Sequence, residues 1–272
     1  MGKTYLITSG KGGSGKTTVT ALLGRCLAHK GKTVLVIDGN FGMRDLDLVL
    51  GLENDCIYHI LDVINEKCSL QEVLISDKEE GLHFLPGPPL TLPQEEQKEK
   101  LTEFCRQMEE KYDFILLDSP PGMGQGFINL AKASSEAIIV TENNPSSLRC
   151  ADRIRQSLFD FNIRNAKLLI NRYTNKENME KSQSEDISLK DMGDLLGLTI
   201  LGVLPETGCV SKELESLFAE EKSLYAGMAI NAVDRLLDEA VPLKDIPLES
   251  STDVENASIE KKKSFFARLF SR

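Results

Sequence analysis

The chain has 272 residues, 41% of them hydrophobic, and a formal net charge of -10 with a pI near 5.0. Its length can bury one substantial core, and its acidic balance excludes non-specific coating of nucleic acid, which needs clustered Lys and Arg. No apolar run approaches the roughly 20 residues of a spanning helix, so the chain is not expected to cross a bilayer. Six cysteines without CxxC spacing, and no signal peptide before the first apolar run, predict a cytoplasmic protein with mostly buried, reduced thiols.

Short apolar runs alternate with longer amphipathic stretches along the chain. We interpret the apolar runs as buried parallel strands, at residues 5–8, 33–37, 82–85, 114–117, 137–140, 167–170 and 199–203. Helical periodicity marks residues 17–29, 94–110, 147–159 and 224–239. The alternation predicts an α/β fold with a doubly wound, mostly parallel sheet and helices on both faces. Ligands bind beyond the carboxyl ends of the strands in such sheets, so functional residues are expected in the loops that follow them.

The pattern divides the chain into three parts. One α/β domain is expected over residues 1–240. Pro242, Pro247 and a polar run that follows them predict a flexible linker over residues 241–258. The last part, residues 259–272, has a different composition.

A phosphate-binding loop is predicted at residues 10–18, between the first strand and the first helix. The sequence GKGGSGKT fits GxxxxGK[ST] in the strand-to-helix context that this motif requires. Backbone N–H groups and the helix N-terminus are expected to bind the phosphates of ATP, with Lys16 on the β and γ phosphates and Thr17 on Mg²⁺. The nucleotide-binding residues predicted here are Gly12, Gly13, Ser14, Gly15, Lys16, Thr17 and Thr18. The motif predicts an ATPase with the P-loop NTPase fold.

Lys11 and Asp118 are two further candidate residues of the nucleotide site. A single P-loop does not need Lys11, so we interpret it either as a solvated loop lysine or as a cation that reaches the phosphates of a second copy and couples nucleotide to dimerisation. Asp118 ends a buried strand, where a carboxylate suits a hydrated Mg²⁺; the alternative is an N-cap of the next turn.

Several segments together give the chain a family resemblance. The phosphate loop KGGSGKTT is accompanied by VIDGNFGMRDLDLVLGLEN, LLDSPPGMGQG, LLINRY and the end KKKSFFARLFSR. Over nearly its whole length the chain resembles the MinD family of septum-placing ATPases. The resemblance implies an ATP-bound homodimer closed on Lys11, a Walker B carboxylate at Asp118, and a C-terminal amphipathic helix that binds membrane. It also implies adenine-binding positions, whose alternative is ordinary loop polarity, at Asn171, Arg172, Pro205 and Glu206.

The loop after the second strand departs from the family pattern. The family usually reads DxDxGxRNLD, whereas this chain has Asp38, then Asn40 at the second acidic position, with Asp45 where the family has Asn. An amide can orient the attacking water but cannot accept its proton, and phosphoryl transfer depends chiefly on positioning. We therefore expect catalytic roles for Lys11, Lys16, Asp38 and Asn40, slow hydrolysis, and a long-lived ATP-bound dimer. In a less favoured alternative Asp45 supplies the missing carboxylate.

The C-terminal segment, residues 259–272, predicts an interfacial helix. From residue 260 onward it carries five positive charges and one negative charge, hence +4, on an otherwise acidic chain. Apolar and basic side chains occupy different sectors of a helical wheel, as in helices that lie on anionic lipid. The membrane residues predicted are Phe265, Phe266, Leu269, Phe270, Lys262, Lys263 and Arg268. The alternatives are a helix that packs on its own domain and a solvated basic tail.

These features predict a peripheral protein on the inner face of the cell membrane. The resemblance implies recruitment of a MinC-like division inhibitor and a MinE-like or DivIVA-linked topological factor, with residues 147–159, including Arg149, Asp152 and Arg153, as a partner surface. No nucleic acid is expected as a partner. Two rival functions are a DNA-partition ATPase, which the acidic charge and Phe-rich tail oppose, and a nucleotide-gated membrane scaffold with little turnover, which Asn40 favours.

Overall fold

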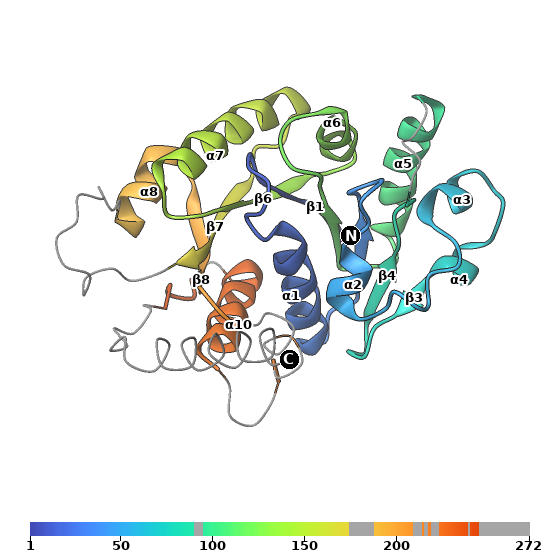
Figure 1. The fold of residues 1–272 in the computed structure, drawn as a ribbon, viewed down its shortest axis with the longest axis horizontal. Coiled ribbons are helices and arrows are strands. Elements are labelled where there is room, and N and C mark those ends of the chain that lie inside the picture. The colour runs from blue at the N-terminus through green and yellow to red at the C-terminus, as the bar shows by residue number, and fades with distance from the viewer. Residues whose placement is uncertain are drawn as a thin grey trace, which may run out of the picture. The chain divides into compact units, whose positions relative to one another are not determined.

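A computed structural model of the chain describes residues 1–89, 95–173, 188–208, 214, 217–218, 223–238 and 240–244. Its centre is an eight-stranded sheet in the order β3-β4-β2-β5-β1-β6-β7-β8 (Figure 1). Every neighbouring pair is parallel except β3 with β4. The strands are β1 Lys3–Thr8, β2 Val34–Asp38, β3 Ile75–Ser76, β4 Leu82–Leu85, β5 Phe114–Asp118, β6 Glu136–Thr141, β7 Ala166–Tyr173 and β8 Thr199–Pro205.

Helices cover both faces of the sheet (Figure 1). Helices α1 Lys16–His29, α2 Leu46–Leu50 and α10 Leu224–Leu237 lie on one face. On the other lie α5 Glu95–Met108, α6 Gln125–Lys132, α7 Pro145–Leu158 and α8 Leu189–Leu196. The short elements α3 Ile60–Ile64, α4 Leu70–Val73 and η1 Phe159–Phe161 lie in the connections. The two faces follow from right-handed crossovers, because the chain crosses toward β2 through α1 and toward β6 through α6.

The doubly wound, mostly parallel fold predicted from the apolar runs is confirmed. All seven predicted strands are present, and β1, β2, β4, β5 and β6 are almost fully buried, as parallel strands covered on both faces must be. The prediction omitted β3, which has only two residues, and the helices α2, α3, α4, α6 and α8, none of which exceeds eight residues. Such short segments contain too few turns to show a helical period.

Two glycines let helices approach the sheet closely. A Cβ on Gly202 of β8 would lie 2.5 Å from the Cβ of Ala232, and one on Gly24 of α1 would lie 3.0 Å from Val36. Helix α1 is also fixed by Arg25, which is buried and forms a two-pronged ion pair with Asp77 at 2.8 and 3.1 Å. The helix that carries the phosphate loop is therefore held rigidly on the sheet.

The cysteines and the start of the predicted linker differ from the sequence-based expectations. Of the five cysteines that the structure describes, only Cys26 and Cys105 are buried, so the prediction of mostly buried thiols is wrong. Cys56 and Cys68 are half-buried in connections, and Cys150 is half-buried on α7, where it faces Gly10 of the phosphate loop. The first residues of the predicted linker, 241–244, hydrogen-bond to α10, whereas residues 245–258 lie outside the described residues.

Candidate nucleotide site

The phosphate loop lies between β1 and α1, at the carboxyl edge of the sheet. Gly13 and Gly15 have φ of +79° and +86°, which turns the loop so that α1 begins at Lys16. Gly15 is the N-cap of α1, and no side chain caps the helix. The first N–H groups of α1 are therefore available to an anion, in line with the positive end of the helix dipole.

Asn171 holds the loop from the opposite side. Its Nδ2 donates to the backbone oxygen of Ser14 at 2.9 Å, and a Cβ on Gly15 would lie 2.3 Å from the same nitrogen. The hydroxyl of Ser9 donates to the backbone oxygen of Lys11 at 2.7 Å. Only a glycine fits at position 15, since it needs both a positive φ and room for the amide of Asn171.

Asp118 meets the first turn of α1 at the end of β5. Its two carboxylate oxygens accept hydrogen bonds from the hydroxyls of Thr17, at 2.7 Å, and Thr20, at 3.2 Å. The carboxylate is completely buried, and Lys16 is also buried. A hydroxyl and a carboxylate side by side next to a phosphate loop are oxygen donors that suit a hydrated Mg²⁺, so the residues present fit the ion that the motif implies. Thr20, which the sequence analysis did not single out, is three residues after Thr17 and could have been found by helical spacing.

Two buried carboxylates lie together beneath this site. Asp38 and Asp118 are directly opposite each other in the β2–β5 register. Burial and then the charge of Asp38 raise the pKa of Asp118 to about 7, against the hydrogen bonds of Thr17 and Thr20 and the charge of Lys16. Burial likewise raises the pKa of Asp38 to about 6 and lowers the pKa of Lys16. A cation near Asp118 would favour its ionised form.

Asp38 organises the loop that follows β2. Its two oxygens accept the backbone N–H groups of Asn40, at 2.9 Å, and Leu46, at 3.0 Å, so one carboxylate joins the start of the loop to the start of α2. The backbone oxygen of Asn40 in turn accepts N–H groups from Met43 and Arg44. Among the described residues the side-chain amide of Asn40 has no hydrogen-bond partner. This side chain is therefore available to a ligand, whereas both oxygens of Asp38 are already occupied.

The predicted adenine-binding positions come together around one cavity. Asn171 and Arg172 lie in an irregularity of β7 between Ile170 and Tyr173, Pro205 ends β8, and Glu206 follows it. With Gly15 and Thr18 they line a cavity of about 70 Å³, which Thr207 and Tyr225 complete. Sequence reasoning missed these last two residues. Thr207 lies just beyond the predicted pair Pro205 and Glu206. Tyr225 lies in the first turn of α10, whose sequence carries no binding motif.

The other predicted residues lie on the surface or outside the described residues. Lys11 is exposed, as a lysine that reaches another molecule must be. On α7, Arg149 and Arg153 are exposed, whereas Asp152 accepts hydrogen bonds from Arg155 at 2.8 Å and Gln156 at 2.7 Å. The predicted membrane residues of 259–272 lie outside the described residues. In the part of the chain that is described, no helix is long and apolar enough to cross a membrane.

A glycine-rich loop between β1 and α1, with a buried carboxylate at the end of the neighbouring parallel strand, defines a P-loop NTPase. Comparison with known proteins agrees: a family model described as an AAA domain matches residues 2–170. The septum site-determining protein MinD of Synechocystis is 36% identical over 257 residues, which cover 93% of this chain and 96% of that protein. The chain belongs to the MinD family of septum site-determining ATPases.

Solved structures of the same family share the fold. The MinC:MinD cell division complex of Aquifex aeolicus aligns with a TM-score of 0.77 and 36% identity, covering 89% of this chain and 98% of that one. MinD of Pyrococcus horikoshii, solved with Mg-ADP, aligns with a TM-score of 0.74 and 29% identity, covering 88% and 98% of the two chains. The family resemblance that the sequence motifs indicated is thereby confirmed.

Proposed function

We propose that this chain binds Mg–ATP, dimerises on it, and in that state binds the inner face of the cell membrane, where it recruits a division inhibitor. The observation that carries the proposal is the joint placement of the phosphate loop, Thr17 and Asp118. The P. horikoshii relative solved with Mg-ADP supports the same ligands here. Thr17 and Asp118 would hold the ion, which when bound neutralises charge on the phosphates.

The base of ATP is assigned to the cavity lined by Asn171, Arg172, Pro205 and Glu206. This cavity adjoins Gly15 and Thr18, so a nucleotide whose phosphates lie on the loop can reach it. Asn171 contributes twice, because its Nδ2 fixes the loop through Ser14 while its oxygen has no donor among the described residues. Lys11, exposed and not needed to close its own loop, is proposed to reach the phosphates of the second copy.

Slow hydrolysis is part of the proposal. Two observations support Asn40 as the residue that orients the attacking water. Its side-chain amide has no partner in the described part of the chain, and it lies two residues after Asp38. Asp38 is better supported as a positioning residue, since both its oxygens hold the backbone of the loop. An amide orients water without accepting a proton, so turnover is expected to be slow and the ATP-bound dimer long-lived.

Membrane binding is assigned to residues 259–272. Each cation contributes about 1 kcal/mol near an anionic surface and each buried Phe at most about 1.5–3 kcal/mol, from which the cost of ordering the helix is subtracted. One such segment binds weakly, but a dimer carries two, and the second insertion is intramolecular. ATP thus controls membrane residence through dimerisation.

Partner binding completes the proposal. The MinC:MinD complex of A. aeolicus supports a MinC-like partner, and a MinE-like or DivIVA-linked factor is proposed to set its position. On α7 the exposed Arg149 and Arg153 form the proposed partner surface, with Asp152 holding the neighbouring Arg155 in place.

Co-sedimentation with anionic liposomes tests the central claim. The full chain should pellet with ATP and much less with ADP, while a chain truncated before Ile259 should stay in the supernatant with both nucleotides. Lys11→Ala, which keeps the tail, should pellet weakly even with ATP. ATP-independent pelleting, or no loss on truncation, would contradict the coupling. Phosphate release measured with lipid and partner present distinguishes the ATPase from a scaffold without turnover.

A further inference from the structure

The chain beyond α10 is tied back to that helix. We call residues 240–244 the C-terminal strap. The side-chain amide of Asn231 donates to the backbone oxygen of Pro242 at 3.2 Å and accepts from the backbone N–H of Lys244 at 3.2 Å. Arg235, one turn further along α10, donates to the backbone oxygen of Val241. Three residues of the strap are therefore held by two side chains of one helix.

Asn231 is buried where its side chain can hold the strap. It is only 3% exposed and lies on the packed side of α10 between apolar neighbours. Burying an unpaired amide is unfavourable, yet both ends of this amide are satisfied, and both by backbone groups of the strap. Among the described residues the side chain of Asn231 bonds only to the strap, so the strap accounts for a polar side chain at this buried position.

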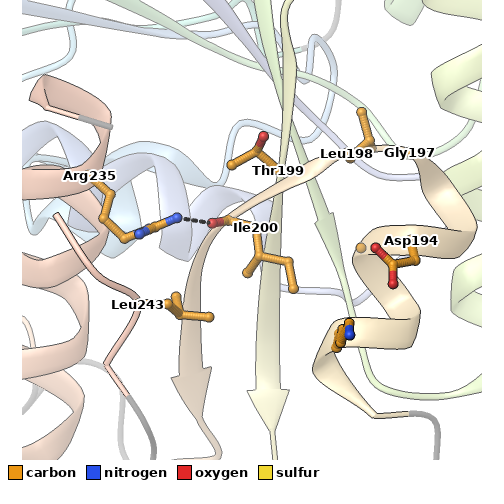
Figure 2. Close-up of a pocket in the computed structure, with 9 residues that line it drawn as sticks. Asp194, Gly197, Leu198, Thr199, Ile200, Arg235 and Leu243 are labelled. Carbon is orange, nitrogen blue, oxygen red and sulfur yellow. Dashed lines mark hydrogen bonds between the residues drawn. The ribbon is translucent and has the colours of Figure 1, made fainter. Parts of the chain in front are cut away.

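Arg235 connects the strap to the sheet. Its Nε donates to the backbone oxygen of Leu201 at 3.1 Å, and its Nη2 donates to that of Ile200 at 2.9 Å. Figure 2 shows the bond to Ile200, with Leu243 of the strap on the same side of an open hollow of about 480 Å³. The strap is thus joined to the first residues of β8.

This position is at the edge of the sheet that lies opposite the nucleotide site. Pro205, at the other end of β8, lines the base cavity five residues after Ile200, a separation of about 17 Å along the strand. Tyr225, in the first turn of α10, lines the same cavity, whereas Asn231 and Arg235 lie nearer the other end of the helix. The close contact of Gly202 with Ala232 fixes α10 on β8 between these two points.

We propose that the strap is the fixed root of the membrane-binding segment and that Asn231 and Arg235 are the residues that position it. This inference rests on the proposed membrane function. While the strap is held, the predicted linker between the strap and the membrane-binding segment has 14 residues, 245–258. If the whole strap were released from the end of α10, the linker would have 21 residues, 238–258. The effective concentration of a second tethered group falls roughly as the −3/2 power of tether length, so release weakens the second insertion about twofold.

The test uses the full chain with Asn231→Leu, which removes the bonds to Pro242 and Lys244, keeps that of Arg235 to Val241, and leaves α10 apolar where it packs. The linker in this variant begins at residue 242 and has 17 residues instead of 14. Asp234→Asn is the matched control, because Asp234 lies on the same helix but pairs with Lys30 at 2.6 Å. Hydrogen exchange at the backbone amide of Lys244, which donates to Asn231, should become fast in Asn231→Leu and stay as in the unchanged chain in the control. Titration with vesicles of anionic phospholipid and ATP should give about a 1.3-fold higher half-saturating lipid concentration for Asn231→Leu only.

Three results would overturn the inference. One is fast exchange at Lys244 in the unchanged chain, and another is unchanged exchange at Lys244 in Asn231→Leu. The third is loss of protection without any change in ATP-dependent lipid binding, which would leave the strap with a purely structural role. A chain truncated before Ile259 separates the two proposals: if it still binds the vesicles, the membrane function fails, while the exchange data still report whether the strap is held.

Discussion

Replacing Gly15 by Ala tests whether the phosphate loop depends on Asn171. Any residue with a Cβ at φ +86° incurs roughly 1–2 kcal/mol of backbone strain. At Gly15 the new Cβ also lies 2.3 Å from the Nδ2 of Asn171, which must move away from the buried backbone oxygen of Ser14. Leaving that oxygen unpaired costs roughly 1–3 kcal/mol more. Gly15→Ala should therefore destabilise the nucleotide-free chain by about 2–5 kcal/mol.

Gly13→Ala is the matched control for this prediction. Gly13 has a similar φ of +79°, but a Cβ there meets no atom within 4 Å, so only the strain of roughly 1–2 kcal/mol is expected. Urea unfolding of the nucleotide-free variants measures the difference. In an Asn171→Ala background the cost of Gly15→Ala should fall to that of Gly13→Ala, since the clashing amide is gone. Equal effects of the two single changes, or no reduction in the double variant, would refute the reasoning.

Three further predictions concern the same site. Asp118→Asn should raise the melting temperature of the nucleotide-free chain near pH 8. The pKa of this carboxylate is raised to about 7 in the folded chain, so it destabilises the fold once the pH exceeds the pKa that it has in the unfolded chain. The same substitution should abolish the added stability from Mg–ATP. In the unchanged chain, calorimetry should show that Mg²⁺-dependent nucleotide binding weakens from pH 8 to pH 6 and releases protons, a trend that Asp118→Asn should lack. Asn40→Asp should raise single-turnover hydrolysis, whereas an unchanged rate would remove Asn40 from the catalytic residues.

The phosphate loop and the strands could be predicted from the sequence because their signals are local. The residues 10–18 carry a complete motif, and a parallel strand covered on both faces must be a continuous apolar run. Since the carboxyl ends of such strands share one edge, Asp118, Asn171 and Pro205 could be expected near the loop without knowledge of the strand order. The departure at Asn40 is equally a property of the sequence.

Only the tertiary structure decided which of these residues contact each other. The hydrogen bond from Asn171 to Ser14 spans 157 positions, and the pairing of Asp38 with the N–H of Leu46 depends on a loop path without any periodicity. The strap shows the same limit, because Pro242 and its neighbours predict a flexible linker until the buried amide of Asn231 is seen to bind them. Sequence patterns encode local conformation and burial, whereas side-chain contacts between distant segments depend on how the elements pack.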